Sequence, residues 1–325
     1  MTAQPQVLPG GAGSSPAPPP ERRAGSSRTL VRLTPFLLLL LPVGLVALAL
    51  GYPLWRQVVM SFQEFGLAQQ FGQPPEFVWL SNYTAILSDG YFWTVTARSL
   101  VFTAACAAAT MFVGVGLAVM MQRVTAAVRV LLQVVLVFAW ATPVIAAVAI
   151  WKLMVDHRHG VVNAVLVTLG LEQFQGFHWL QESTGTFLLV AGTVIVWAST
   201  PLVALATFAA LTQVDDSVVE AAQLDGAGLL RRLRYIVLPI IKPVLILLAI
   251  LQVIWDLRVF AQIYSLQQGA GSSRATNLLG TYIYHTGIGG GNYGMASALA
   301  MVMLAILVVL TWRYVRLLGK QGDLT

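Results

Sequence analysis

The polar residues of this chain gather in one patterned stretch between two long hydrophobic runs. Its first part holds two carboxylates, three alanines and a glycine, at Glu220, Ala221, Ala222, Asp225, Gly226 and Ala227. An apolar second part leads into the next hydrophobic run through Leu233, Ile236, Leu238 and Pro239. Charges, helix formers and a glycine hinge between two hydrophobic segments are the combination expected of a functional site where the chain leaves the bilayer.

No catalytic constellation stands beside this stretch or elsewhere in the chain. The sequence has no phosphate-binding loop of the form G-x-x-x-x-G-K-[ST], and the Gly-rich stretch 287–294 contains no Lys. The four histidines fall in predicted outer loops, away from any convincing nucleophile. His157 and His159 lack the further His or Cys ligands of a metal site. We therefore expect a chain that is not an enzyme and holds no cofactor.

The patterned stretch should fold as a helix, a turn and an amphipathic helix. Residues 220–222 favour helix, and Gly226 suits a sharp break. Leu, Ile and Val recur at three- and four-residue spacing over 229–237, on one helical face. Pro239 and Pro243 lack a backbone donor, so we expect them to end the second helix and restart the chain as a membrane span.

The composition is that of an integral membrane protein. The chain is 57% hydrophobic and 10% charged, with a mean hydropathy of +0.76. About 20 apolar residues are needed to cross the hydrocarbon core. Six runs meet this need, namely 33–55, 99–122, 130–151, 186–213, 244–255 extended by its flanks, and 292–312. The predicted fold class is all-α with six transmembrane helices.

Basic residues orient these spans. With six spans both termini lie on one side, and that side holds 13 of the 19 Lys and Arg residues. Since Lys and Arg are retained in cytoplasmic loops, both termini and the loop 214–242 should face the cytoplasm. The net charge of +6 follows from this topology, so we do not interpret it as nucleic-acid binding.

Composition also divides the chain into regions. Residues 1–29 are rich in Pro, Gly, Ser and Ala and should form a disordered cytoplasmic tail. A six-span domain over 30–318 and a short cytoplasmic tail at 319–325 should follow. A cleaved signal peptide is the alternative for the first span, because 47–49 imitates a cleavage site, but the apolar run continues to Trp55. The outer loop 152–185 has room for an interfacial helix over 161–171.

The patterned stretch resembles the coupling loop of the membrane-spanning permease subunits of binding-protein-dependent ABC importers. That loop reads EAA, three residues, G, nine residues and I-x-L-P, and residues 220–239 fit it without a gap. Asp225 and Ala227 complete its common DGA form, and Leu233 stands where Phe is usual. The resemblance implies a type I ABC importer permease fold in a bacterial cytoplasmic membrane. It also implies that this loop docks on a separate ATPase subunit.

Further stretches resemble the carbohydrate importers, and specifically the maltose-permease-like subunit. Residues 77–83 are similar to the FVGLxNY stretch of that subunit, with Trp79 in place of the usual Gly. An aromatic belt at the outer membrane interface would explain the same residues. Gly, Asn and Leu over 160–166 also match, whereas 267–276 lacks the TxGGP stretch, so its contacts are not carried over.

The resemblance implies partners and a substrate class. The partners would be a second related permease, two ATPase subunits that bind Mg-ATP, an extracytoplasmic solute-binding protein and membrane lipid, with no nucleic acid. The substrate would be a sugar or oligosaccharide. Two alternatives stay open, an ABC importer for another solute such as a glycerol phosphate ester or a polyamine, and an ion-coupled secondary transporter.

Polar residues inside two spans are candidates for the substrate path. Trp197, Ser199 and Thr200 precede Pro201 in the fourth span, and Gln252 and Asp256 lie in the fifth. Polar groups at membrane depth need partners in protein or in a water-lined cavity. Ser199 and Thr200 would alternatively satisfy carbonyl groups that Pro201 leaves free.

Overall fold

The computed structural model describes residues 27–268 and 273–322, which fall into two units, Met1–Arg56 and Gln57–Thr325. The tail expected at 1–29 lies almost wholly outside the described residues, as do 323–325. In chain order the elements are α1 Ser27–Ser61, β1 Gln63–Glu64, α2 Leu67–Gln70, β2 Glu76–Phe77, α3 Ser81–Ser88, α4 Gly90–Met121, α5 Ala126–Ala141, α6 Val144–Met154, α7 Val161–Thr168, η1 Glu172–Phe174, α8 Thr184–Leu211, α9 Asp216–Leu224, α10 Leu229–Arg232, η2 Leu233–Val237, α11 Leu238–Leu257, α12 Ala261–Gln267, α13 Ser273–Thr276, α14 Leu279–Tyr284, η3 His285–Gly289 and α15 Tyr293–Gly322.

The expected all-α membrane fold is confirmed. Among the described residues, five helices are long and apolar enough to cross a membrane, and the bent pair α5 and α6 makes a sixth. The described strands are the two-residue antiparallel pair β1 and β2. In the first unit, α1 exposes apolar side chains such as Leu38, Leu40 and Leu48, as a lipid-facing or subunit-facing helix does.

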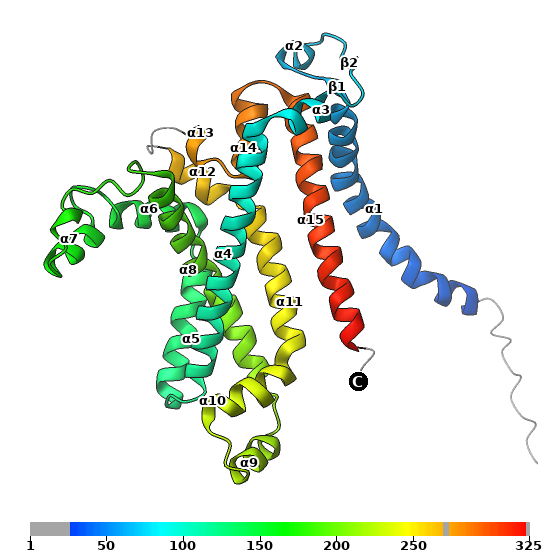
Figure 1. Ribbon diagram of the computed structural model, residues 1–325. Helices are drawn as coiled ribbons and strands as arrows, with labels where there is room; N and C mark the ends of the chain where they lie inside the picture. The colour runs from blue at the N-terminus through cyan, green and yellow to red at the C-terminus, as the bar shows by residue number, and fades with distance from the viewer. Residues whose placement is uncertain (1–26, 269–272, 323–325) are drawn as a thin grey trace, which may run out of the picture. The chain divides into compact units, whose positions relative to one another are not determined.

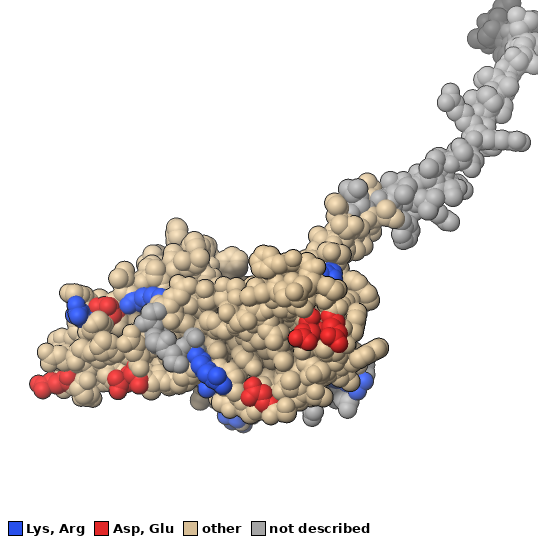
Figure 2. Space-filling view, turned by 90° about the horizontal axis from the view of Figure 1, so that it is seen from above, with Lys and Arg blue, Asp and Glu red and all other residues tan. Residues whose placement is uncertain are grey.

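The core of the second unit lies along α4, α8 and α11. Helix α4 packs along α8, and their backbones approach closely at Gly114, where a Cβ would lie 2.6 Å from Cγ1 of Val203. The α9–α10 loop lies at one end of this unit, and α12, α13 and α14 lie at the other (Figure 1). Seen from above, charged side chains form small separate groups on a mostly uncharged surface (Figure 2).

Two details of the expected spans are wrong. The run 130–151 is not one helix, because α5 and α6 are bent by 102° at a break that contains Pro143. Pro239 and Pro243 do not end the second helix of the loop, since α10, η2 and α11 follow one another without a non-helical residue. Pro239 occupies the first turn of α11, and the π-helical turn η2 just before it changes the hydrogen-bond register.

Candidate functional site

The loop between α8 and α11 is closed by local backbone hydrogen bonds. Asp215 caps α9, since its carboxylate accepts a hydrogen bond from the backbone N–H of Ser217 at 2.8 Å. These bonds hold the pKa of Asp215 below its usual range. The position confirms the predicted helix over 220–222, which lies inside α9.

Gly226 ends α9 in a conformation that requires glycine. Its φ is 76°, in the left-handed region. Its N–H donates to the carbonyl of Gln223 at 3.0 Å, and the N–H of Ala227 donates to the carbonyl of Ala222 at 3.0 Å. This pair of bonds is the Schellman closure, in which the residue after the helix adopts positive φ. The glycine expected to break the helix therefore does so.

The two short helices of the loop expose most of their side chains. Leu224 is 90% exposed and Leu230 is 75% exposed, whereas Ala222 is buried. Glu220 and Asp225 are exposed as well. Apolar leucines beside free carboxylates at the tip of a loop form a surface suited to another protein.

The second half of the motif joins the loop to the membrane helices. Leu233 and Ile236 belong to η2, while Leu238 and Pro239 begin α11. Val237 and Leu238 pack against a buried cluster at the ends of α4, α8 and α11 that adjoin the loop, formed by Ala118, Ala210, Leu211 and Ile241. A displacement of the loop would therefore be passed directly to these three helices.

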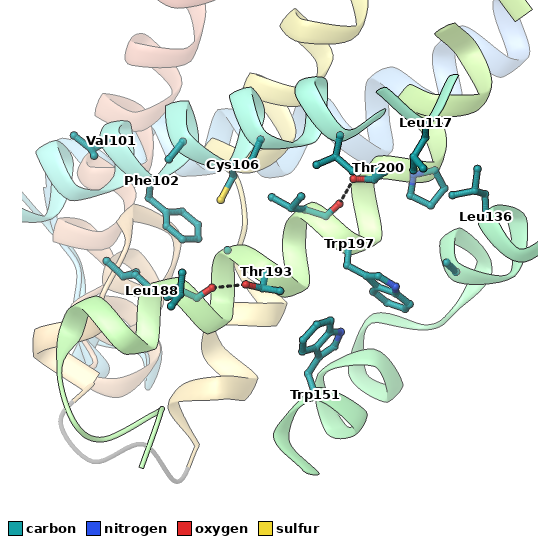
Figure 3. Close-up of a pocket in the computed structure, with 18 of the residues that line it drawn as sticks. Val101, Phe102, Cys106, Leu117, Leu136, Trp151, Leu188, Thr193, Trp197 and Thr200 are labelled. Atoms are coloured by element: carbon teal, nitrogen blue, oxygen red, sulfur yellow. Dashed lines mark hydrogen bonds between the residues drawn. The ribbon is translucent and has the colours of Figure 1, made fainter. Parts of the chain in front are cut away.

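A cavity of about 820 Å³ lies between α4, α5, α6 and α8. Two of the predicted path residues, Trp197 and Thr200, line it, and Trp151 faces Trp197 at 6.3 Å between ring centroids (Figure 3). Thr193 and Thr200 lie on its wall, but their hydroxyls donate to carbonyls of their own helix, those of Leu189 and Val196 (Figure 3). The remaining lining is almost wholly apolar.

The other three predicted path residues do not line this cavity. Gln252 and Asp256 are buried in α11, and the side-chain amide of Gln252 donates to Oδ1 of Asp256 at 2.8 Å. Ser199 is half-buried on α8. Thr200 does not satisfy the carbonyl freed by Pro201, since that carbonyl belongs to Trp197 and the Thr200 hydroxyl bonds Val196.

Sequence reasoning missed two residues of the cavity wall. Trp151 meets Trp197 because of the bend between α5 and α6, which no local pattern predicts. No motif marks Arg98, yet it lines the same cavity. The described residues contain no group of three or more His, Cys, Asp or Glu side chains that would hold a metal ion.

In the stretch 77–83, Trp79 stands at the position where the sugar-permease pattern has Gly. Trp79 has a φ of 51°, the left-handed region that favours glycine. Hydrogen bonds hold the turn, from the backbone of Val78 to the carbonyl of Phe62 and from the side chain of Asn82 to the carbonyls of Ser61 and Gln63. Trp79 is thus held in a conformation that costs roughly 1–3 kcal/mol.

A known protein family and several known proteins are similar to this chain in sequence. The family described as "Binding-protein-dependent transport system inner membrane component" matches residues 111–319. The chain is 38% identical over 301 residues to the diacetylchitobiose uptake system permease protein DasB of Streptomyces coelicolor, covering 93% of this chain and 91% of that protein. It is 33% identical to the sulfoquinovosyl glycerol transport system permease protein SmoG of Agrobacterium fabrum, covering 89% and 92%.

A solved structure agrees in fold. A chain of the bacterial alginate ABC transporter, solved with an alginate pentasaccharide-bound periplasmic protein, superposes with a TM-score of 0.75. The identity is 20%, and the match covers 89% of this chain and 95% of that chain. The family match begins within α4, ends within α15 and includes the whole loop 214–242. The chain therefore belongs to the inner-membrane components of binding-protein-dependent transport systems.

Proposed function

We propose that this chain passes a sugar or oligosaccharide from an extracytoplasmic binding protein into the cytoplasm, driven by a separate ATPase. The observation that carries the proposal is the loop 214–242. It combines an exposed protein-binding surface at Leu224 and Leu230 with direct packing of Val237 and Leu238 on three membrane helices. A loop with this geometry converts contact with a partner into movement of the spans.

The sugar class is supported by two relatives whose names refer to glycosides, diacetylchitobiose and sulfoquinovosyl glycerol. The stretch 77–83 supports the same class through its resemblance to the sugar permeases. An importer of a glycerol phosphate ester or of a polyamine remains the alternative that uptake of labelled solutes distinguishes.

The partners would be a second related permease, two ATPase subunits that bind Mg-ATP, and the solute-binding protein. Both termini and the loop 214–242 would face the cytoplasm, with tails at 1–29 and 319–325. Glu220, Ala221, Ala222, Asp225, Gly226 and Ala227 would form the docking half of the loop. Leu233, Ile236, Leu238 and Pro239 would transmit its movement.

The cavity between α4, α5, α6 and α8 would form this chain's wall of the substrate path. The apolar faces of a sugar ring would pack on the indole rings of Trp151 and Trp197. Because the Thr193 and Thr200 hydroxyls donate to carbonyls of their own helix, they would not act as donors to the sugar. Ser199, Gln252 and Asp256 would contribute only after a rearrangement that exposes them.

The ATPase subunits act on an equilibrium between two arrangements of the permease pair. A partner shifts such an equilibrium only if it binds the two arrangements with different affinity. The closed loop favours this mode of action, because Gly226 and its Schellman bonds fix the way in which the chain leaves α9. Closure of the ATPase pair would then move α9 and α10 as one lever.

The test is affinity purification of the tagged chain in mild detergent, with ATPase activity measured with and without binding protein loaded with candidate sugars. We expect a second permease and an ATPase to co-purify, and one loaded binding protein to raise the activity. Recovery of the chain alone, under conditions that preserve related complexes, would contradict the proposal and favour an ion-coupled transporter.

A further inference from the structure

Charge in the large cavity comes from a single residue. Arg98, in the third turn of α4, is the one charged side chain among the described residues that line the space between α4, α5, α6 and α8. Gly185 and Leu188, which also line the cavity, lie in the first turns of α8, so Arg98 marks its outer end. Measured along the axis of α8 at 1.5 Å per residue, Trp197 lies about 18 Å from Gly185.

Arg98 is held in position by a hydrogen bond to a residue that is itself fixed by side-chain hydrogen bonds. Its Nη1 donates to the backbone carbonyl of Asn277 at 3.0 Å. The Asn277 side chain is fixed in turn, because its Nδ2 donates to the hydroxyl of Tyr91 and its Oδ1 accepts from Nε2 of Gln267. The guanidinium is thereby anchored at one nitrogen.

The positive charge of Arg98 has no negative partner in the described part of the chain. No described carboxylate lies within 4.0 Å of the guanidinium, since the described ion pairs both belong to Asp156. One hydrogen bond uses one of the five N–H donors of an arginine. A cation beside apolar walls acts over a longer range than in water, so it attracts oxygen acceptors and repels ammonium groups.

We propose that Arg98 is a specificity-determining residue of the path, which donates hydrogen bonds to oxygen atoms of the sugar at the outer end of the cavity and disfavours ammonium-bearing sugars. This inference rests on the proposed sugar import. Arg98 orients the acceptor groups of the sugar first, and the ring then meets Trp151 and Trp197 deeper in the cavity.

The first test measures the potential in the cavity without any sugar. A Cys106→Ala background removes the only native thiol, and Thr193→Cys places a new one on the exposed cavity wall. The assembled complex is treated with a sulfonate-bearing or a trimethylammonium-bearing methanethiosulfonate. The ratio of the two rates cancels changes in thiol reactivity. Arg98→Met should lower the sulfonate preference several-fold, while Arg98→Lys should retain it.

The second test measures transport in proteoliposomes with N,N′-diacetylchitobiose and its loaded binding protein. Arg98→Met should raise KM about tenfold with little change in kcat, as for a lost hydrogen bond from a charged donor. The same change should relax discrimination against chitobiose, which carries two ammonium groups. Arg258→Met is the matched control, because Arg258 is exposed at the end of α11 and does not line the cavity.

The outcomes separate the inference from the proposed function. An unchanged KM and an unchanged sugar ratio in Arg98→Met would overturn the role of Arg98, even if the reagent ratio shifts. An unchanged reagent ratio would overturn it as well. Absence of uptake by the unmodified complex, with a normal reagent ratio, for N,N′-diacetylchitobiose and for every other sugar offered with its loaded binding protein, would instead contradict sugar import.

Discussion

The loop 214–242, named the inner loop after its predicted side of the membrane, and the opposite end of the second unit around α12, α13 and α14, named the outer end, are built in opposite ways. In the inner loop, the bonds that close α9 join residues two to five positions apart, as between Ala227 and Ala222. At the outer end, side chains of three membrane helices donate to backbone carbonyls of 268–277. These bonds span 91 to 183 positions and are Tyr91 to Arg274, Arg98 to Asn277, Lys152 to Gln268 and Thr184 to Ala275.

The two regions obtain their shapes from different kinds of contact, local in the inner loop and long-range at the outer end. The inner loop is defined by its own sequence and leaves its side chains exposed for a partner, as Leu224 shows. The outer end exists only when α4, α6 and α8 are assembled, because each supplies a donor. Local changes should therefore affect coupling at the inner loop and stability at the outer end.

The largest expected effect is at Gly226. Gly226→Pro should abolish uptake and ATPase stimulation in an assembled complex, because proline cannot adopt a φ of 76° and lacks the N–H that bonds Gln223. The cost to loop closure is about 3 kcal/mol or more. Gly228→Pro is the matched control, since Gly228 has a φ of −63° that suits proline. Normal uptake by a well-expressed Gly226→Pro variant would contradict the proposed role of the loop in coupling ATPase closure to transport.

A smaller effect is expected at Glu220. Glu220→Gln should weaken association with the ATPase subunit about tenfold, as for loss of a charged hydrogen-bond partner, while leaving the thermal stability of the chain unchanged. Glu220 is exposed and makes no hydrogen bond or ion pair within the described residues, so its removal costs the fold little. Pull-down of the ATPase with matched thermal melts measures both; a lowered melting temperature would show a structural role instead.

At the outer end the expected loss is in stability. Tyr91→Phe removes a hydroxyl that donates to the carbonyl of Arg274 and accepts from Asn277. We expect about 1–2 kcal/mol of destabilisation, from two modest hydrogen bonds. Tyr235→Phe, on the exposed inner loop, should change the free energy of unfolding by at most a few tenths of a kcal/mol. Equal shifts in thermal unfolding for the two variants would erase the contrast between the regions.

The smallest effect is a pH dependence in the outer turn after α6. Backbone N–H groups of His159 and Arg158 bond the carboxylate of Asp156 and hold its pKa below its usual range. A lowered folded-state pKa stabilises the turn above the unfolded value of about 3.9, and this contribution is lost as pH falls through the folded-state pKa.

The protection factors of the amides over 156–160, in which the observed exchange rate is compared with the intrinsic rate at the same pH, measure this effect between neutral and acid pH. Asp156→Asn should expose these amides faster at neutral pH and remove the acid dependence. Asp215 offers the same test in the inner loop, where its carboxylate bonds Ser217. Protection factors in the native turn that do not fall as the pH is lowered would contradict the prediction.

Much of the fold was predictable because it depends on local pattern. The six apolar runs report directly on the membrane, since about 20 apolar residues are needed to cross it. The loop motif predicts its own local fold, because α9 and its glycine ending are held by hydrogen bonds between near neighbours in the sequence. The family comparison confirms the class of protein that the motif indicated.

Other features needed the assembled structure. Pro143 marks a bend of 102°, whereas Pro239 and Pro243 lie within continuous helix, so proline alone did not predict where a helix breaks. The five candidate path residues share polarity in sequence, yet only Trp197 and Thr200 line the cavity.

The membrane spans and the local fold of the loop 214–242 could be predicted from the sequence, because hydropathy and short-range hydrogen bonds act within a single segment. Only the tertiary structure decided that Trp151 meets Trp197 and that Arg98 lines their cavity, anchored on Asn277. These positions depend on helix crossings and on contacts between residues up to 183 apart, and no local pattern encodes such distances.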